Sequence, residues 1–290
     1  MKWAHLLPAL AVVSAASTAR AAALDEAVAG ARSYAMGGAH RGVGTSNDTL
    51  FLNPAGMAVA KRYGLEVTYG YTKADDQNHL SVSAVDSKSG PVAGGIAFAH
   101  VGSGVFTGGL NHFYLSGAYL ISDAIAVGAS LHYIHGGYLN LAGGNIGVNL
   151  YTGDVGVMAI LNENLSIGVS YNNVVTTSEP LLTPATLGFG AALTFSAFTL
   201  AYDMTLGVGS DSDQGVGYHA GAEYFLFQQF PVRVGYARER VPSASGNPYH
   251  DYASGGLGYA QQGGALEVSY RQAFDHGRDW GIVGSLKLFL

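Results

Sequence analysis

The sequence predicts an all-β protein: a transmembrane antiparallel β-barrel of about 14 strands with an N-terminal plug in its lumen. Three observations lead to this fold class. The chain is apolar without containing an apolar block, apolar and polar residues alternate along most of it, and its connections alternate between short and long. We divide the 290 residues into a signal peptide (1–21), the plug (22–62) and the barrel (63–290).

The composition is unusual for a soluble protein of this length. Charged residues make up only 12% of the chain, Gly occurs 42 times, and Cys is absent. No internal window reaches the roughly 18 unbroken apolar residues that a membrane helix needs. The net charge of −6 is modest, and no basic stripe indicates nucleic-acid binding. The lack of Cys excludes a disulfide scaffold and any Cys-based metal site or nucleophile.

The first 21 residues are typical of a secretory signal peptide. Lys2 precedes the apolar run LLPALAVVSAAS, and the small-x-small sequence ARA ends at Ala21. A charged start, a short apolar centre and a small-residue cleavage site are the three parts of such a signal. The run is short for an uncleaved membrane anchor. We therefore expect an exported protein that is cleaved after Ala21, with Ala23 as the next candidate.

The segment 22–62 does not alternate. LDEAVAGARSYAMGG predicts a short helix that Gly37 and Gly38 end, and Asp48 or its neighbour Asn47 is placed to cap a second helical turn. Pro54 limits the length of that turn. The lumen of a 14-stranded barrel is too wide for its own side chains to fill. We therefore expect this segment to fold into the lumen, where the apolar stretch LFLNPAGMAVA is shielded from water.

From residue 63 onward the pattern has a period of two. In GLEVTYGYT (64–72), the Leu, Val and Tyr residues fall on one face, and the Glu, Thr and Gly residues fall on the other. Such alternation is the signal of strands with one apolar and one polar face. It predicts strands near residues 63–73, 78–86, 92–102, 109–121, 124–135, 145–161, 164–174, 184–195, 198–208, 216–227, 230–240, 250–261, 264–274 and 278–290.

The connections favour a barrel in an outer membrane. SDA, NEN, SA and QQGG are tight turns, whereas HGGYLNLAGG, VTTSEPLLT, GVGSDSDQG and VPSASGNPYH are longer, and short turns on one side with long loops on the other are typical of such barrels. A soluble β-sandwich or solenoid would also alternate, but its outward face would carry charges. Here the larger face is apolar, so we expect it to point outward to lipid.

The stretch SYAMGGAHRGVGTSNDTLFLNPAGMAVA resembles the N-terminal hatch of the FadL/TodX (OmpP1) family of outer-membrane transporters for hydrophobic compounds. Those proteins carry a Gly/Ala-rich run, an Asp-containing stretch and an Asn-Pro-Ala-(Gly/Ala)-(Leu/Met) motif before their strands. The matching plug residues here are Gly37, Gly38 and Ala39, then Asp48, then Asn53, Pro54, Ala55, Gly56 and Met57. The same pattern resembles PorV-type barrels, which are partners in protein secretion and attachment. This chain is much shorter than the transporters, and its loops are small.

The alternation places most of the charged strand residues on the inward face. These are Glu66, Asp154, Asp203, Glu223, Arg233, Glu267, Arg271 and Lys287. Strands five to eight instead point mostly small residues inward. One interpretation is a lumen with a charged wall and a smooth wall that borders a ligand path. The other is that the charges only pair with each other and with plug residues such as Arg32 and Arg41, because a charge inside a barrel needs a partner in any case.

The third strand, PVAGGIAFAHVGSG, contains Gly94 and Gly95. Glycine within a strand often marks a bulge or kink. In the FadL-like transporters a kink in the third strand opens a lateral exit into the bilayer, so the resemblance implies a kink at these two glycines.

These observations predict a function without catalysis. No metal-binding or nucleophile motif appears, although a Ser–His pair on neighbouring strands stays possible from sequence. We expect a monomeric channel in the outer membrane of a Gram-negative-type bacterium that works without a cofactor. Its partners would be the surrounding lipids and a small hydrophobic ligand, fatty-acid-like or aromatic, that diffuses passively past the hatch. The alternative is a non-transporting barrel of the PorV type that docks secreted or surface proteins.

Overall fold

The computed structural model describes residues 28–290, except 75, 103–105, 140–144, 176–181, 209–214, 241–248, 275–276 and 278. The signal peptide and the first six residues of the predicted plug (22–27) lie outside this part of the chain. Within it, no helix is both long and apolar enough to cross a membrane.

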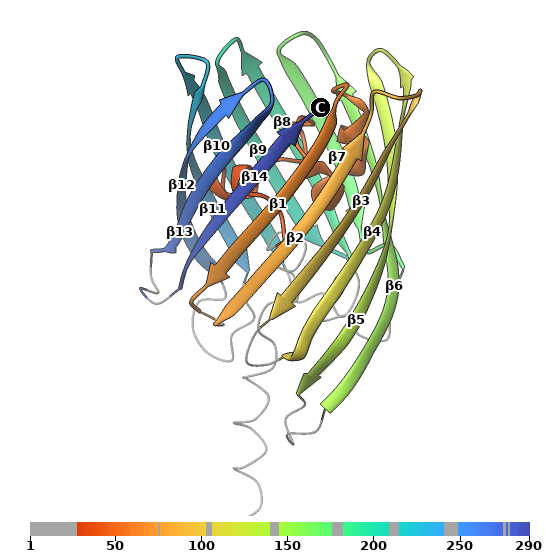
Figure 1. Cartoon of the computed structure of the whole chain (residues 1–290), viewed down its shortest axis with the longest axis vertical. Coiled ribbons are helices and arrows are strands. Elements are labelled where there is room, and N and C mark those ends of the chain that lie inside the picture. The colour runs from red at the N-terminus through yellow and green to blue at the C-terminus, as the bar shows by residue number, and fades with distance from the viewer. Residues whose placement is uncertain are drawn as a thin grey trace, which may run out of the picture.

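Fourteen antiparallel strands form a closed barrel (Figure 1). They are β1 Tyr63–Thr72, β2 Gln77–Asp86, β3 Val92–Gly102, β4 Phe106–Ser122, β5 Ile125–Leu139, β6 Asn145–Ile160, β7 Leu165–Asn172, β8 Thr186–Phe195, β9 Phe198–Gly207, β10 Val216–Leu226, β11 Phe230–Arg240, β12 Tyr249–Gln261, β13 Gly264–Ala273 and β14 Trp280–Phe289. Each strand pairs with its sequence neighbours, and β1 closes the barrel against β14. The predicted fold class and strand number are confirmed.

The apolar face of the strands points outward and the polar face points into the lumen, as predicted. In β1, Leu65 and Tyr69 are 43% and 58% exposed on the outer surface, whereas Glu66 and Thr68 are 4% and 1% exposed. The same apolar-out pattern continues around the barrel, so the outer wall presents mainly apolar side chains. Such a surface is solvated by lipid rather than by water.

The two ends of the barrel differ in their connections. At one end the strands are joined by residues 87–91, 123–124, 161–164, 196–197, 227–229 and 262–263, and we call it the short-turn end. The C-terminus lies there (Figure 1). The opposite end, here the long-loop end, holds the longer connections such as 173–185.

The irregular strand is β4 rather than β3. Gly108 and Gly109 of β4 have φ angles of 76° and 82°, in the left-handed region that favours glycine. The register between β4 and β5 shifts between Phe106 and Leu110, so these glycines form a bulge. Both strands continue past the bulge, which makes them longer than predicted.

Residues 28–62, the described part of the plug, lie inside the barrel (Figure 1). They form α2 Ala31–Ala35, α3 Thr49–Leu52 and the 3-10 helix η1 Pro54–Ala58. Gly37 and Gly38 follow α2 with φ angles of 67° and 85°, which a helix C-terminus needs in order to turn. Asn53 starts η1: its backbone is extended, and its side-chain oxygen accepts a hydrogen bond from Ala55 N at 3.3 Å.

Candidate functional site

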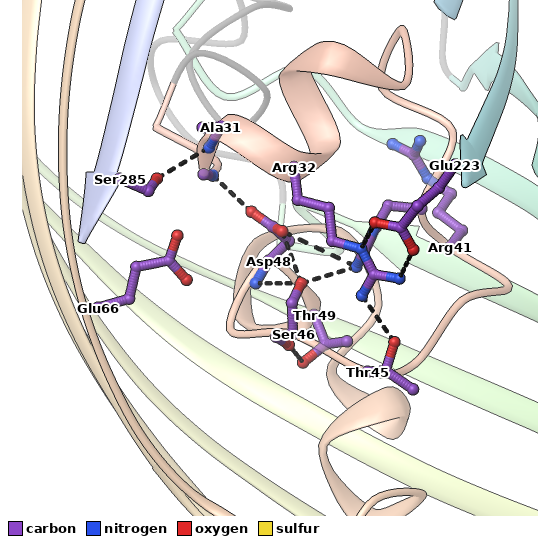
Figure 2. A network of polar contacts seen from close by, with 12 residues as sticks. Ala31, Arg32, Arg41, Thr45, Ser46, Asp48, Thr49, Glu66, Glu223 and Ser285 are labelled. Atoms are coloured by element: carbon purple, nitrogen blue, oxygen red, sulfur yellow. Dashed lines mark hydrogen bonds and ion pairs between the residues drawn. The ribbon is translucent and has the colours of Figure 1, made fainter. Parts of the chain in front are cut away.

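A chain of alternating charges joins the plug to one wall of the lumen. Arg32 of α2 donates to Glu223 on β10, with Nη2 to Oε1 at 2.5 Å (Figure 2). Arg233 on β11 donates to the other oxygen of Glu223 at 2.6 Å. Arg233 also reaches Glu267 on β13 at 2.8 Å. Lys287 on β14 completes the chain, 2.9 Å from Glu267 and 3.6 Å from Glu66. Five of the eight predicted lumen charges therefore meet in one network.

The other three predicted charges lie in separate pairs. Asp203 on β9 accepts hydrogen bonds from the backbone N–H groups of His40 and Arg41, at 2.9 and 2.8 Å. Asp154 on β6 lies 2.7 Å from His132 Nε2. Arg271 on β13 pairs with Glu239 at 2.6 Å and stacks on Tyr252, with its guanidinium carbon 3.8 Å from the ring centre. The structure therefore supports charge pairing with the plug and among the strands rather than one continuous charged wall.

Asp48 holds the plug together. Its side chain accepts hydrogen bonds from Gly30 N and from Ser46 Oγ, the latter at 2.6 Å (Figure 2). Burial by itself raises the pKa of Asp48, but three effects outweigh it and lower the pKa to about 2: the charge of His40 whenever that ring is protonated, the charge of Lys287, and these two hydrogen bonds. Burial lowers the pKa of His40, which bonds Ser46 at 2.8 Å, to about 3. At neutral pH we therefore assign an ionised Asp48 beside a neutral His40.

This cluster is not a catalytic triad. Ser46 donates its hydroxyl hydrogen bond to Asp48, so Nε2 of His40, which faces Ser46, must be the donor of the His40–Ser46 hydrogen bond. A histidine in that role cannot remove a proton from the serine. No group of three or more potential metal ligands occurs among the described residues either.

The opposite side of the plug is apolar. Leu50, Phe51 and Leu52 of α3 and Met57 of η1 are at most 3% exposed. Phe51 packs edge-on against Tyr114 of β4, with ring centres 5.0 Å apart. The same apolar cluster continues along the inward faces of β3 to β6, through Ala97, Ala99, Val101, Leu110, Ala126, Ile134, Val148, Leu150 and Met158. The apolar cluster therefore lies on the β3 to β6 side of the lumen, next to the buried His132–Asp154 pair.

Inward-facing glycines let the plug lie directly against the wall. A Cβ atom on Gly128 of β5 would lie 2.5 Å from Ala55 N, and one on Gly156 of β6 would lie 2.1 Å from the side-chain oxygen of Asn53. On β7, a Cβ at Gly168 would lie 2.1 Å from Arg41 O. The small inward residues of strands five to eight were one predicted border of a ligand path. Plug atoms occupy the space at these glycines.

The predicted kink in the third strand is wrong. β3 is paired without interruption to β2 from Gly94 to Gly102, and to β4 from Val92 to Val101. Gly94 points outward with nothing near it. Gly95 points inward, where a Cβ would lie 2.4 Å from Leu50 Cδ2. Gly95 leaves room for Leu50 of the plug, and the pairing of β3 shows no break over its described residues, Val92–Gly102.

The motif of the predicted hatch is central to these contacts. Asn53 donates to Arg41 O at 2.9 Å and to Val157 O at 3.3 Å, so it ties two parts of the plug to each other and to β6. Pro54 and Ala55 lie over Gly128. Gly56 lies against Thr49: a Cβ atom added to Gly56 would be 2.7 Å from the methyl carbon of Thr49. The sequence analysis does not identify Ser46 or the glycines that contact the plug, Gly128, Gly156 and Gly168. The only sequence signal for these glycines is that they fall on the inward face of predicted strands.

Comparison with solved structures finds the same fold in hydrophobic-compound channels. The CymD monoaromatic hydrocarbon channel has a TM-score of 0.66 and 16% identity, over 91% of this chain and 98% of that one. The toluene transporter TbuX of Ralstonia pickettii has a TM-score of 0.60 and 14% identity, with the same coverage. A FadL homologue of Pseudomonas aeruginosa has a TM-score of 0.61 and 13% identity, over 90% and 98%.

Comparisons with protein-family models and with curated proteins gave no match. At 13–16% identity the structural likeness concerns the fold. The resemblance that the hatch motif predicts is confirmed at that level: this chain has the fold of the FadL-like channels, a closed barrel of fourteen strands.

Proposed function

We propose that the protein is an outer-membrane channel through which small hydrophobic molecules diffuse passively, with the plug as its gate. The apolar cluster on the inner faces of β3 to β6, here called the apolar wall, carries this proposal; it adjoins the His132–Asp154 pair. Val101, Leu110, Ile134 and Leu150 all point inward, at most 5% exposed, and connect to the apolar side of the plug. The interior of a barrel that passes water is polar. An apolar inner wall suits an apolar cargo.

The structural neighbours support the same cargo class. CymD is described as a monoaromatic hydrocarbon channel and TbuX as a toluene transporter. We extend that class to this chain as a proposal: single-ring aromatic or short alkyl compounds enter from the long-loop end, which faces the outside of the cell. One chain closes the barrel by itself, and our proposal is that the channel functions as a monomer surrounded by lipid.

The first test measures cargo. Cells that lack the protein are complemented with it or with a variant, and uptake of labelled toluene is followed. Ile134→Asp places a charge in the apolar wall, and we expect uptake to fall about tenfold or more, because a charge is strongly unfavourable beside apolar groups. Ile134→Val keeps the wall apolar and serves as the control. Toluene uptake that is equal with and without the protein, together with a co-purifying partner protein, would refute the channel and favour a docking barrel.

The second test locks the gate. The chain has no Cys, so an engineered pair is unique. A Cβ on residue 95 would lie 3.4 Å from Leu50 Cγ. The sulfur of a cysteine at residue 50 would lie near that Cγ position, so a Leu50→Cys/Gly95→Cys pair is placed to form a disulfide. We expect oxidation to stop toluene uptake and reduction to restore it. Ser116→Cys/Ser130→Cys, whose hydroxyls are 2.7 Å apart within the wall, is the matched control. Uptake that continues through the locked pair would show that the plug is not the gate.

A further inference from the structure

A cavity of about 330 Å³ lies between the plug and the barrel wall at the short-turn end. Plug residues Thr45, Ser46, Asn47 and Arg62 form one side of it, and the first residues of β1 and the ends of β10 to β14 form the other. The inward-facing rings of Phe225 and Phe289 line it together with charged side chains. The apolar wall of the proposed channel is on β3 to β6, so the proposed function leaves this cavity without a role.

Four cations line the cavity: Arg32, Arg62, Arg233 and Lys287. Three of them belong to the alternating chain with Glu223, Glu267 and Glu66, in which cations and carboxylates are equal in number. The fourth, Arg62, takes part in none of the ion pairs of the described residues. The side-chain hydrogen bond of Arg62 among the described residues runs from Nη2 to Ser46 O at 2.7 Å.

Unused donors point to a missing acceptor. Arg62 Nε, Arg62 Nη1 and Arg233 Nη1 are buried and have no hydrogen-bond partner among the described residues. Arg233 is only 3% exposed. Buried donors without an acceptor are unfavourable and rare in folded proteins. Burial and then repulsion from Arg32 lower the pKa of Arg62 to about 10, and together they outweigh the attraction of Asp48 and Glu66, which raises it.

We propose that this cavity binds a small aromatic carboxylate. The carboxylate accepts hydrogen bonds from Arg62 and Arg233, because a guanidinium presents paired donors that match the two oxygens. The ring packs on Phe225 and Phe289. The volume of about 330 Å³ is near the lower end of the ~300–1,000 Å³ range of small-molecule sites, which suits one ring rather than a long alkyl chain. The inference rests on the proposed function, since it places a second class of cargo at the short-turn end of the same channel.

Direct binding tests the site. Benzoate is titrated into the purified full-length protein in detergent, and the heat of binding is measured. We expect Arg62→Gln to weaken benzoate binding about tenfold or more, because charge-assisted hydrogen bonds are lost. Lys61→Gln is the matched control: Lys61 is the exposed neighbour, carries the same charge and does not line the cavity. Benzamide, which has the ring without the charge, should bind the unchanged protein about tenfold more weakly than benzoate.

A second variant tests the aromatic part of the site without touching the plug. Phe225→Leu keeps the apolar contact but removes the ring face, and we expect benzoate binding to weaken about threefold. Equal losses in Arg62→Gln and Lys61→Gln would overturn the proposal. So would benzamide binding as tightly as benzoate, or displacement of benzoate by inorganic phosphate at equal concentration, since phosphate carries charge without a ring.

Parallel measurement of toluene uptake separates this inference from the proposed function. If cells with the unchanged protein take up no toluene while benzoate binding depends on Arg62, the channel proposal fails and the carboxylate site stands. If toluene uptake is present while benzoate does not bind, the carboxylate site fails and the channel proposal stands.

Discussion

Gly128 offers a direct test of how tightly the plug is seated. It lies on the inward face of β5, where an added Cβ would be 2.5 Å from both Ala55 N and Pro54 C. Ordinary contact begins at 3.4 Å, so Gly128→Ala forces the backbone of η1 away by about 0.9 Å. Overpacking of this kind costs about 1–3 kcal/mol. Alanine is better than glycine within a strand by about 0.5–1 kcal/mol, so the cost falls on docking of the plug and not on the barrel.

A cost of about 1–3 kcal/mol lowers the ratio of docked to undocked plug by about 5- to 150-fold. We expect faster proteolytic cleavage of the plug in Gly128→Ala, and higher toluene uptake, while the melting temperature of the barrel stays the same. Gly117→Ala on β4 is the matched control, because its nearest non-neighbouring atom would be Ala93 O at 4.0 Å. If both variants are cleaved at the wild-type rate, the contact between η1 and β5 does not hold the plug, and our reasoning is refuted.

Two further predictions concern the polar side of the plug. Glu223→Gln leaves Arg32 and Arg233 without their shared carboxylate, and we expect the free energy of unfolding in urea to fall by about 3–5 kcal/mol. Combination with Arg32→Met should cost less than the sum of the single losses, and strict additivity would contradict the pairing. Acid should also loosen the plug: a free histidine gains a proton below its ordinary pKa of about 6.5, but buried His40 stays neutral down to about 3. The stabilisation that neutral His40 gives the docked plug is therefore fully present above about pH 6.5, and it falls by up to about 1.4 kcal/mol per pH unit as the pH drops toward 3. The stabilisation that ionised Asp48 gives is lost only below about pH 4. Proteolysis of the plug between pH 7 and pH 4 measures this, and His40→Gln should flatten the profile.

The barrel strands could be predicted from the sequence because they follow one simple pattern. A strand that separates lipid from the lumen must alternate with a period of two, and turn residues must interrupt it. The predicted strand 164–174 and the observed β7, Leu165–Asn172, differ by one or two residues at each end. The extensions of β4 and β5 were missed because Gly108–Gly109 and Gly136–Gly137 look like turn signals. In the structure the first pair forms a bulge within a strand, and the second lies opposite it, with Gly136 beside Leu110.

The lumen was readable only in part. Alternation shows which charges point inward, but partners depend on register and on the path of the plug, and neither is written in local sequence. Asp203 pairs with the plug segment at Arg41, as one of the two interpretations of the sequence allows, but no local pattern predicts that the backbone N–H groups of His40 and Arg41 are the donors. Gly95 is a second example of a contact that the local sequence does not reveal. Its missing side chain signals special geometry, and only the structure shows that the reason is contact with Leu50 and not a kink.

Under the gating role proposed above, the distribution of contacts within the plug predicts which part of it would move. Residues 30–48 are held by directional polar bonds: Arg32 to Glu223, the Asp48 cluster, and the backbone of Arg41 to Asp203. Residues 50–58 rest on the wall mainly through apolar side chains and over glycines, with Asn53 as their main polar tie. Apolar contacts tolerate sliding better than charged hydrogen bonds do, because they have no preferred direction. An apolar molecule that arrives along β3 to β6 also reaches the apolar cluster to which residues 50–58 belong. The gate is therefore expected to be this second half of the plug, hinged on an anchored first half, rather than the whole segment.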